Sequence, residues 1–186
     1  MKKIVLMGPE CVGKTNLTVQ LAAHFHTLYC IEYTRAYLTI RNQEATRKAT
    51  KIVSAYTDVE PMAIGQLAME DSIIEQSKFI EYPIMFFDTN IETNLIYSQY
   101  YFQQSPTWLN EIAAQRSYDF YLLLYPDIAW VADGLRDRPN ARMEMYELFK
   151  NYLQTHKRNF MEVKGTDKQR LKNAIEAIEV SGYWRD

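Results

Sequence analysis

The chain has 186 residues, enough for one domain with a substantial core, so we expect a single domain over residues 1–186 without motor or helicase modules. Its 21 lysines and arginines against 23 aspartates and glutamates give a net charge of -2 without a basic run, which argues against a nucleic-acid-binding surface. Two cysteines are too few for a zinc site made of cysteine pairs and are typical of a reducing compartment. With no apolar stretch near the roughly 18 residues of a membrane span and no room for a signal peptide before the first strand, we expect a cytoplasmic protein.

The first predicted elements are a buried strand at residues 4–7, a glycine-rich loop at residues 8–15 and a helix at residues 16–25. The loop reads Gly-Pro-Glu-Cys-Val-Gly-Lys-Thr, the pattern of a phosphate-binding loop. Glycine allows backbone dihedrals that a β-carbon disfavours, so successive N–H groups can surround a phosphate at the helix start. A chance match in an ordinary glycine-rich turn is the weaker alternative. The sequence therefore predicts a site for a nucleoside triphosphate.

Within this loop, we expect Lys14 to contact the β- and γ-phosphates and the Thr15 hydroxyl to bind Mg²⁺. The predicted nucleotide-binding residues are Gly8, Pro9, Glu10, Cys11, Val12, Gly13, Lys14, Thr15, Asn16 and, after the last predicted strand, Thr166. The expected ligands are ATP and Mg²⁺.

The rest of the chain alternates short apolar runs with helical patterns. Further buried strands are predicted at residues 28–31, 84–87, 120–124 and 160–163, and further helices at residues 62–81, 145–152 and 171–178. Residues 41–58 are polar without an apolar face, and we predict a mobile surface excursion there. Strands alternating with helices predict an α/β fold of three layers with a parallel sheet of five strands, covered on both faces.

Polar residues follow the predicted strands, at the edge where open parallel sheets bind ligands. Asp88 and Glu32 are the candidates for a carboxylate that orders the water around Mg²⁺ or accepts a proton from an attacking hydroxyl. Asp88 is also a candidate metal ligand beside Thr15. The structural alternatives are a helix cap at Asp88 and an ion pair between Glu32 and Arg35. The sequence leaves open which carboxylate is the base.

Three arginines follow the fourth predicted strand, in a region of about residues 126–142 that we interpret as a lid. Arg136, Arg138 and Arg142 could neutralise the charge on a phosphoryl group in transfer when such a flap closes. Taken singly, each would be an ordinary solvated surface charge.

Aromatic residues near two strand ends are candidates for stacking on a planar substrate. Tyr97 follows the third predicted strand, and Trp130 with Asp133 follows the fourth. Aromatic faces and a nearby carboxylate favour a flat cationic ring. Simple packing is the alternative for either ring.

Taken together, these residues resemble the ribosylnicotinamide kinase domain of NadR-type proteins over almost the whole chain. The likeness rests on residues 130–136 (Trp-Val-Ala-Asp-Gly-Leu-Arg), the Gly-Pro-Glu start of the loop, Glu32-Tyr33 with Arg35, Ile64-Gly65-Gln66, and Asp88-Thr89. It implies a phosphate-loop kinase fold and the ATP-dependent phosphorylation of the 5′-hydroxyl of nicotinamide riboside, which gives nicotinamide mononucleotide for NAD salvage. The expected substrate-binding residues are Glu32, Tyr33, Arg35, Asp88, Asn90, Tyr97, Trp130 and Asp133.

The chain departs from the family pattern at two places. Asn90 stands where the family commonly has a second aspartate, and Cys11-Val12 replaces small serines in the loop. The adenylyltransferase and DNA-binding modules of larger NadR proteins do not fit in 186 residues. The alternatives are a related nucleoside or small-molecule kinase and a regulatory domain that binds ATP without transferring phosphate.

Overall fold

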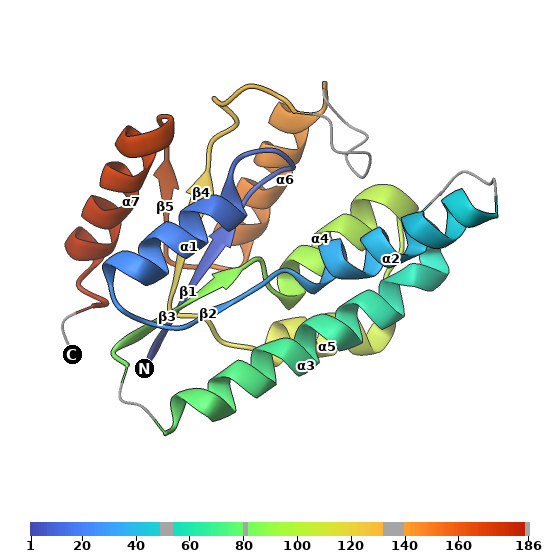
Figure 1. Cartoon of the computed structure of the whole chain (residues 1–186), viewed down its shortest axis with the longest axis horizontal. Coiled ribbons are helices and arrows are strands. Elements are labelled where there is room, and N and C mark those ends of the chain that lie inside the picture. The colour runs from blue at the N-terminus through green and yellow to red at the C-terminus, as the bar shows by residue number, and fades with distance from the viewer. Residues whose placement is uncertain (49–53, 80–81, 132–139, 185–186) are drawn as a thin grey trace.

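The computed structural model describes residues 1–48, 54–79, 82–131 and 140–184. These residues form a parallel sheet of five strands in the order β2-β3-β1-β4-β5, with helices on both faces (Figure 1). The strands are β1 (Lys2–Met7), β2 (Tyr29–Cys30), β3 (Ile84–Asp88), β4 (Phe120–Leu124) and β5 (Phe160–Val163). The predicted α/β fold of three layers is confirmed.

The helices divide between the two faces of the sheet (Figure 1). One face is covered by α1 (Lys14–His24) and α7 (Asp167–Ser181). The other is covered by α3 (Val59–Ser77), α4 (Ile91–Phe102), α5 (Thr107–Gln115) and α6 (Arg142–Thr155). A short 3₁₀ helix, η1 (Tyr56–Asp58), precedes α3, and α2 (Tyr33–Arg47) packs along α3. None of the helices in the described part of the chain is long and apolar enough to cross a membrane.

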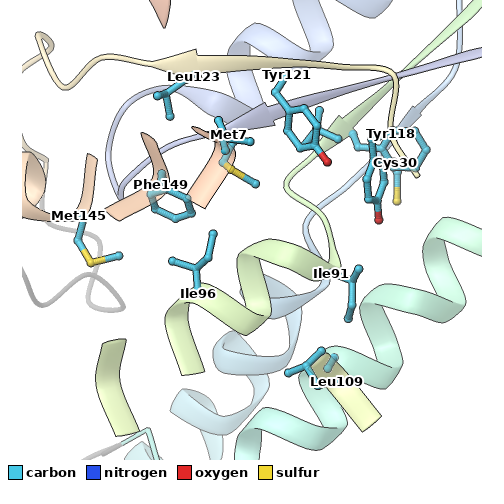
Figure 2. Packing of buried hydrophobic residues seen from close by; sticks show 14 of the residues in the cluster. Met7, Cys30, Ile91, Ile96, Leu109, Tyr118, Tyr121, Leu123, Met145 and Phe149 are labelled. Carbon is cyan, nitrogen blue, oxygen red and sulfur yellow. The ribbon is translucent and has the colours of Figure 1, made fainter. Parts of the chain in front are cut away.

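Alternate residues of the central strands enter two separate cores. Ile4 and Leu6 of β1 pack with α1 and α7, whereas Val5 and Met7 pack with the helices of the opposite face. Figure 2 shows the core that contains Val5 and Met7, where Met7 lies close to Phe149 of α6. Because both faces of a central parallel strand are buried, its sequence is continuously apolar, which is why these strands could be found from sequence.

Where the structure describes residues 41–58, which we predicted to be a mobile surface excursion, most of them are helical, and that regular structure was not predicted. Residues 41–47 continue α2, and residues 56–58 form η1; residues 49–53 lie outside the described residues. No residue of α2 is fully buried, so the helix has no apolar stripe to detect. Polar contacts hold it instead: Tyr37 Oη donates to Asp58 Oδ1 at 2.8 Å, and Arg41 Nη2 lies 3.2 Å from the same oxygen.

Candidate functional site

The phosphate loop, residues 8–15, joins β1 to α1 at the carboxyl edge of the sheet. Gly8 has a φ of 148°, and a β-carbon there would stand 2.9 Å from the Leu124 carbonyl oxygen. Gly13 caps α1 with a left-handed φ of 77°, and no side-chain hydrogen bond caps the helix. The first-turn N–H groups of a helix lack partners within the helix and favour an anion. The loop geometry therefore suits a phosphate, as its sequence predicts.

The side chain of Lys14 reaches back to the start of the phosphate loop. Its Nζ donates to the carbonyl oxygens of Gly8 at 2.9 Å and Pro9 at 2.8 Å. Desolvation by burial lowers the pKa of Lys14, and the charges of Glu32, Asp88 and Glu10 oppose that shift. Three carboxylates from separate parts of the chain thus act on one ammonium group.

Asp88 ends β3, opposite Leu6 of β1, and is 1% exposed. Neither of its carboxylate oxygens has a hydrogen-bond partner of ordinary geometry among the described residues. Burial raises the pKa of Asp88, while the Thr15 hydroxyl and the charges of Lys14 and Arg35 act in the opposite direction. A buried carboxylate with free lone pairs beside the loop can accept a proton or bind a hydrated cation.

Glu32 and its neighbours lie at the start of α2. Glu32 is the N-cap residue of that helix, and its Oε2 lies 3.7 Å from Arg35 Nε, so the ion pair considered from sequence is present. The Tyr33 N–H donates to Gln66 Oε1 on α3 at 3.0 Å. Compared with Asp88, Glu32 is more exposed and already has a cationic partner.

Asn90 is the N-cap residue of α4, and its side chain forms hydrogen bonds with the first turn of that helix. Its Oδ1 accepts from the backbone N–H of Thr93 at 3.2 Å and from the Thr93 hydroxyl at 3.1 Å. Its Nδ2 donates to Glu92 Oε2 at 3.1 Å, and the side chain is fully buried. The structure thus gives Asn90 a helix-capping role, and its contact with the substrate stays a prediction.

Arg142 is the first residue of α6, and it reaches the loop. Its Nη1 donates to the carbonyl oxygens of Ile128 at 2.8 Å and Cys11 at 3.3 Å, and its guanidinium carbon lies 5.9 Å from the centre of the Trp130 ring. Arg136, Arg138 and Asp133 lie outside the described residues. Of the predicted lid arginines, Arg142 is therefore the one that the structure places at the loop.

A small recess, open to solvent, lies beside Arg142. It is lined by Pro9, Glu10, Tyr97, Tyr101, Arg142 and Met145. The Tyr97 and Tyr101 rings stack with centres 6.0 Å apart. The recess brings the phosphate loop next to the aromatic face of α4, where the sequence places a substrate contact.

On the other side of the loop, Arg170 is a functional candidate that sequence reasoning missed. This α7 residue is 4% exposed. It donates to the carbonyl oxygens of Val12, of Tyr125 at 2.9 Å and of Gly165 at 2.6 Å, and it pairs with Asp127. The available signal was an arginine four residues before the buried Ala174, on the apolar face of the helix.

The two remaining predicted nucleotide contacts lie at helix starts. Asn16 is exposed in the first turn of α1, and Thr166 is the exposed N-cap residue of α7, next to Gly165. The described residues contain no group of three or more His, Cys, Asp or Glu side chains arranged to hold a metal. Thr15 and Asp88 offer oxygen ligands of the kind that Mg²⁺ takes together with water and phosphate oxygens.

Comparison with known proteins agrees with this arrangement. A family model described as an AAA domain matches residues 3–170. The trifunctional NAD biosynthesis/regulator proteins NadR of Escherichia coli (strain K12) and Salmonella typhimurium (strain LT2) are each 24% identical over 169 residues, 90% of this chain and 39% of the relative. The chain thus spans about two fifths of the length of these curated relatives.

Solved structures show the same fold. A NadR protein in complex with NAD and AMP-PNP superposes with a TM-score of 0.77 at 21% identity, over 98% of this chain and 49% of that one. A NadR protein in complex with NR gives 0.76 at 20% identity, over 100% and 51%. Thymidylate kinase from Ehrlichia chaffeensis gives 0.63 at 14% identity, over 97% and 98%. Because the family model covers most of the sequence, phosphate loop included, the chain belongs to the AAA domain family, and it is similar to the NadR-type kinase domain.

Proposed function

We propose that this chain is an ATP-dependent kinase that phosphorylates the 5′-hydroxyl of nicotinamide riboside and produces nicotinamide mononucleotide, a cytoplasmic step of NAD salvage. The observation that carries the proposal is the buried, unpaired Asp88 carboxylate beside Lys14 and Thr15 of the phosphate loop. Similarity to the NadR proteins, one of them in complex with NR, supports this choice of acceptor.

The phosphate loop supplies the donor side of the reaction. The uncapped N-terminus of α1 and the Lys14 ammonium bind the phosphates of ATP, and Thr15 with Asp88 would hold Mg²⁺. When bound, Mg²⁺ neutralises charge on the β- and γ-phosphate oxygens. Lys14 would exchange its carbonyl partners for phosphate oxygens, which stabilise its charged form.

On the acceptor side, Asp88 is the better of the two candidate bases. Burial raises its pKa toward the working pH, which increases its strength as a proton acceptor, and neither carboxylate oxygen has a hydrogen-bond partner of ordinary geometry among the described residues. Glu32, with Arg35 as a partner, is better suited to hold a sugar hydroxyl. Both carboxylates act on Lys14, so the attacking hydroxyl and the γ-phosphate would meet between them.

A pyridinium ring would find aromatic partners beside the loop. Trp130 already has the cationic Arg142 at 5.9 Å from its ring centre, so its environment accommodates positive charge on a ring face. Tyr97 lines the recess together with Arg142. These positions support a site for a flat cationic base, with Asp133 as its proposed counter-charge.

An ADP-release screen over a nucleoside panel tests the proposal, with the phosphorylated product identified by mass spectrometry. We expect nicotinamide riboside to give the highest kcat/KM. A stronger purine or pyrimidine nucleoside would favour the alternative of a general nucleoside kinase, which the fold similarity to thymidylate kinase supports. ADP release that no acceptor accelerates would contradict a kinase and favour a regulatory ATP-binding domain.

A further inference from the structure

Two polar side chains on α3, Gln66 and Glu70, are fully buried and touch neither the phosphate loop nor the surface. They lie one helical turn apart, and Gln66 Nε2 donates to Glu70 Oε1 at 3.2 Å. Polar groups lose their water when buried, so such a pair persists only where the protein satisfies it. The other partners of these two side chains therefore show what the pair does.

Each of the two side chains accepts the first backbone N–H of another helix. Gln66 Oε1 accepts from Tyr33 N, the first residue of α2, at 3.0 Å. Glu70 Oε1 accepts from Ile91 N, the first residue of α4, at 3.1 Å, and the Tyr118 hydroxyl holds the other oxygen at 2.6 Å. First-turn N–H groups have no partner within their own helix. One turn of α3 thus caps two helices.

These two helix starts carry the acceptor side of the site. Glu32 is the N-cap of α2, and Asp88 lies two residues before Asn90, the N-cap of α4. The two first turns also meet, because Asn94 Nδ2 donates to Thr34 Oγ1 at 3.5 Å. A shift of either helix start would therefore change the separation of the two carboxylates.

We propose that Gln66 and Glu70 are positioning residues. They fix the starts of α2 and α4, and so hold Glu32, Tyr33 and Asp88 at the separation that the acceptor requires. This inference rests on the proposed kinase function. The phosphate loop forms hydrogen bonds with Arg142 of α6, with Arg170 of α7 and with residues 129 and 131. Loss of the pair should therefore impair acceptor binding more than the metal-free binding of ADP, which depends on the phosphate loop.

Steady-state kinetics of Gln66→Met and Glu70→Gln test this, together with ADP titration of each variant. Gln66→Met removes the acceptor for Tyr33 N without opening a cavity, and we expect a rise of about tenfold or more in the acceptor KM, since small misplacements of reacting groups are costly. Glu70→Gln keeps an oxygen for Ile91 N but takes away the acceptor of the Tyr118 hydroxyl proton, so we expect a smaller rise in the acceptor KM than in Gln66→Met. ADP affinity, measured without Mg²⁺, should not change in either variant.

Tyr37→Phe is the matched control, because it removes a different hydrogen bond that ties α2 to the start of α3. It should change the melting temperature without changing the acceptor KM. An unchanged acceptor KM in Gln66→Met, or an equal loss of ADP affinity, would overturn the proposal. If Gln66→Met does not fold, Gln66→Asn, which withdraws the same oxygen by one methylene, is judged by the same criteria. A wild type that phosphorylates no acceptor would instead contradict the proposed function, and this inference with it.

Discussion

Arg142 Nη1 donates to the carbonyl oxygen of Cys11 at 3.3 Å, so the first turn of α6 is attached to the middle of the phosphate loop. Cys11 itself has a φ of 55°, a left-handed conformation that is uncommon for a residue with a β-carbon. Its sulfur accepts from Val131 N at 3.1 Å. The loop, the segment after β4 and α6 therefore form one connected unit.

Replacement of Arg142 by alanine should weaken ATP binding as well as slow transfer. The carbonyl oxygens of Cys11 and Ile128 would lose their donor, at a cost of about 1–3 kcal/mol, which corresponds to a loss of roughly fivefold to 150-fold in kcat/KM for ATP. Arg116→Ala, which breaks a remote ion pair with Asp71, is the control. Initial-rate kinetics that leave both kcat and the KM for ATP unchanged would show that Arg142 has no part in the site.

Lys14→Ala should abolish transfer and leave a folded protein. The change removes a charge that would contact the phosphates in the transition state, and such losses typically cost on the order of 10²-fold or more in rate. It also leaves Asp88, Glu32 and Glu10 without the cation on which all three act. Lys172→Ala, at an exposed pair with Glu176, should behave as wild type in the same assay. Wild-type turnover in Lys14→Ala would contradict the loop assignment.

The parts of the fold that were predictable are those in which local pattern and burial agree. β4 begins and ends where the apolar run at residues 120–124 predicts, because both of its faces are covered. α2 was not predicted, because its stability comes from tertiary polar contacts that leave no periodic signal. α5 has only nine residues, too few for several repeats of an apolar stripe.

The same distinction applies to the site. The phosphate loop was predictable because its residues are consecutive, and Asp88 because strand ends meet at one edge of the sheet. Arg170 and Glu70 act through backbone groups far away in sequence: 158 residues separate Arg170 from Val12. Such partners have no sequence signature, since any residue supplies a carbonyl oxygen or an N–H.

Because Gly65 lies against the Tyr33 ring, the effect of Gly65→Ala on stability should depend on whether that ring is present. A β-carbon at Gly65 would lie 2.0 Å from the Tyr33 ring, so Gly65→Ala should displace that ring, raise the acceptor KM and cost about 1–3 kcal/mol. In a Tyr33→Ala background the clash is gone, and the better helix propensity of alanine should make the same change stabilising by about 0.5–1 kcal/mol. Thermal unfolding of the four proteins measures this; equal effects of Gly65→Ala in both backgrounds would show that the ring is not the cause.

The charge of the acceptor base offers a test of substrate identity. If a pyridinium stacks on Trp130, nicotinamide riboside should bind more tightly than its neutral reduced form, by about 1–2 kcal/mol in a desolvated site. Trp130→Ala should remove this preference, Trp130→Phe should keep part of it, and Asp133→Asn should narrow it. Calorimetric titration of both ligands provides the comparison. Equal affinities for the two forms in the wild type would remove the argument for a cationic base.

Asp88→Asn should lower the activity of the protein while raising its stability. The substitution removes the proposed base and a ligand for Mg²⁺, and we expect kcat to fall by about 10²-fold or more. Because burial raises the pKa of Asp88, the acid limb of the wild-type pH–rate profile should lie above the range of an ordinary aspartate. Residual activity in the variant should lack that limb. A variant with the wild-type profile would assign the proton acceptor to another group, with Glu32→Gln as the next test.

The stability of Asp88→Asn should rise although its activity falls, and the size of that rise should depend on pH. The folded-state pKa of Asp88 lies above the unfolded value of about 3.9, so the folded protein holds this proton more tightly and loses stability as pH rises through that interval. At neutral pH the ionised, buried carboxylate therefore costs stability that asparagine does not, and Asp88→Asn should melt higher, by about 2–4 °C for each kcal/mol recovered. The difference should shrink as pH is lowered toward 4. Calorimetric scans between pH 8 and about pH 4 measure it, and a melting temperature at or below that of the wild type at pH 7 would show that Lys14 and Thr15 compensate the buried charge in full.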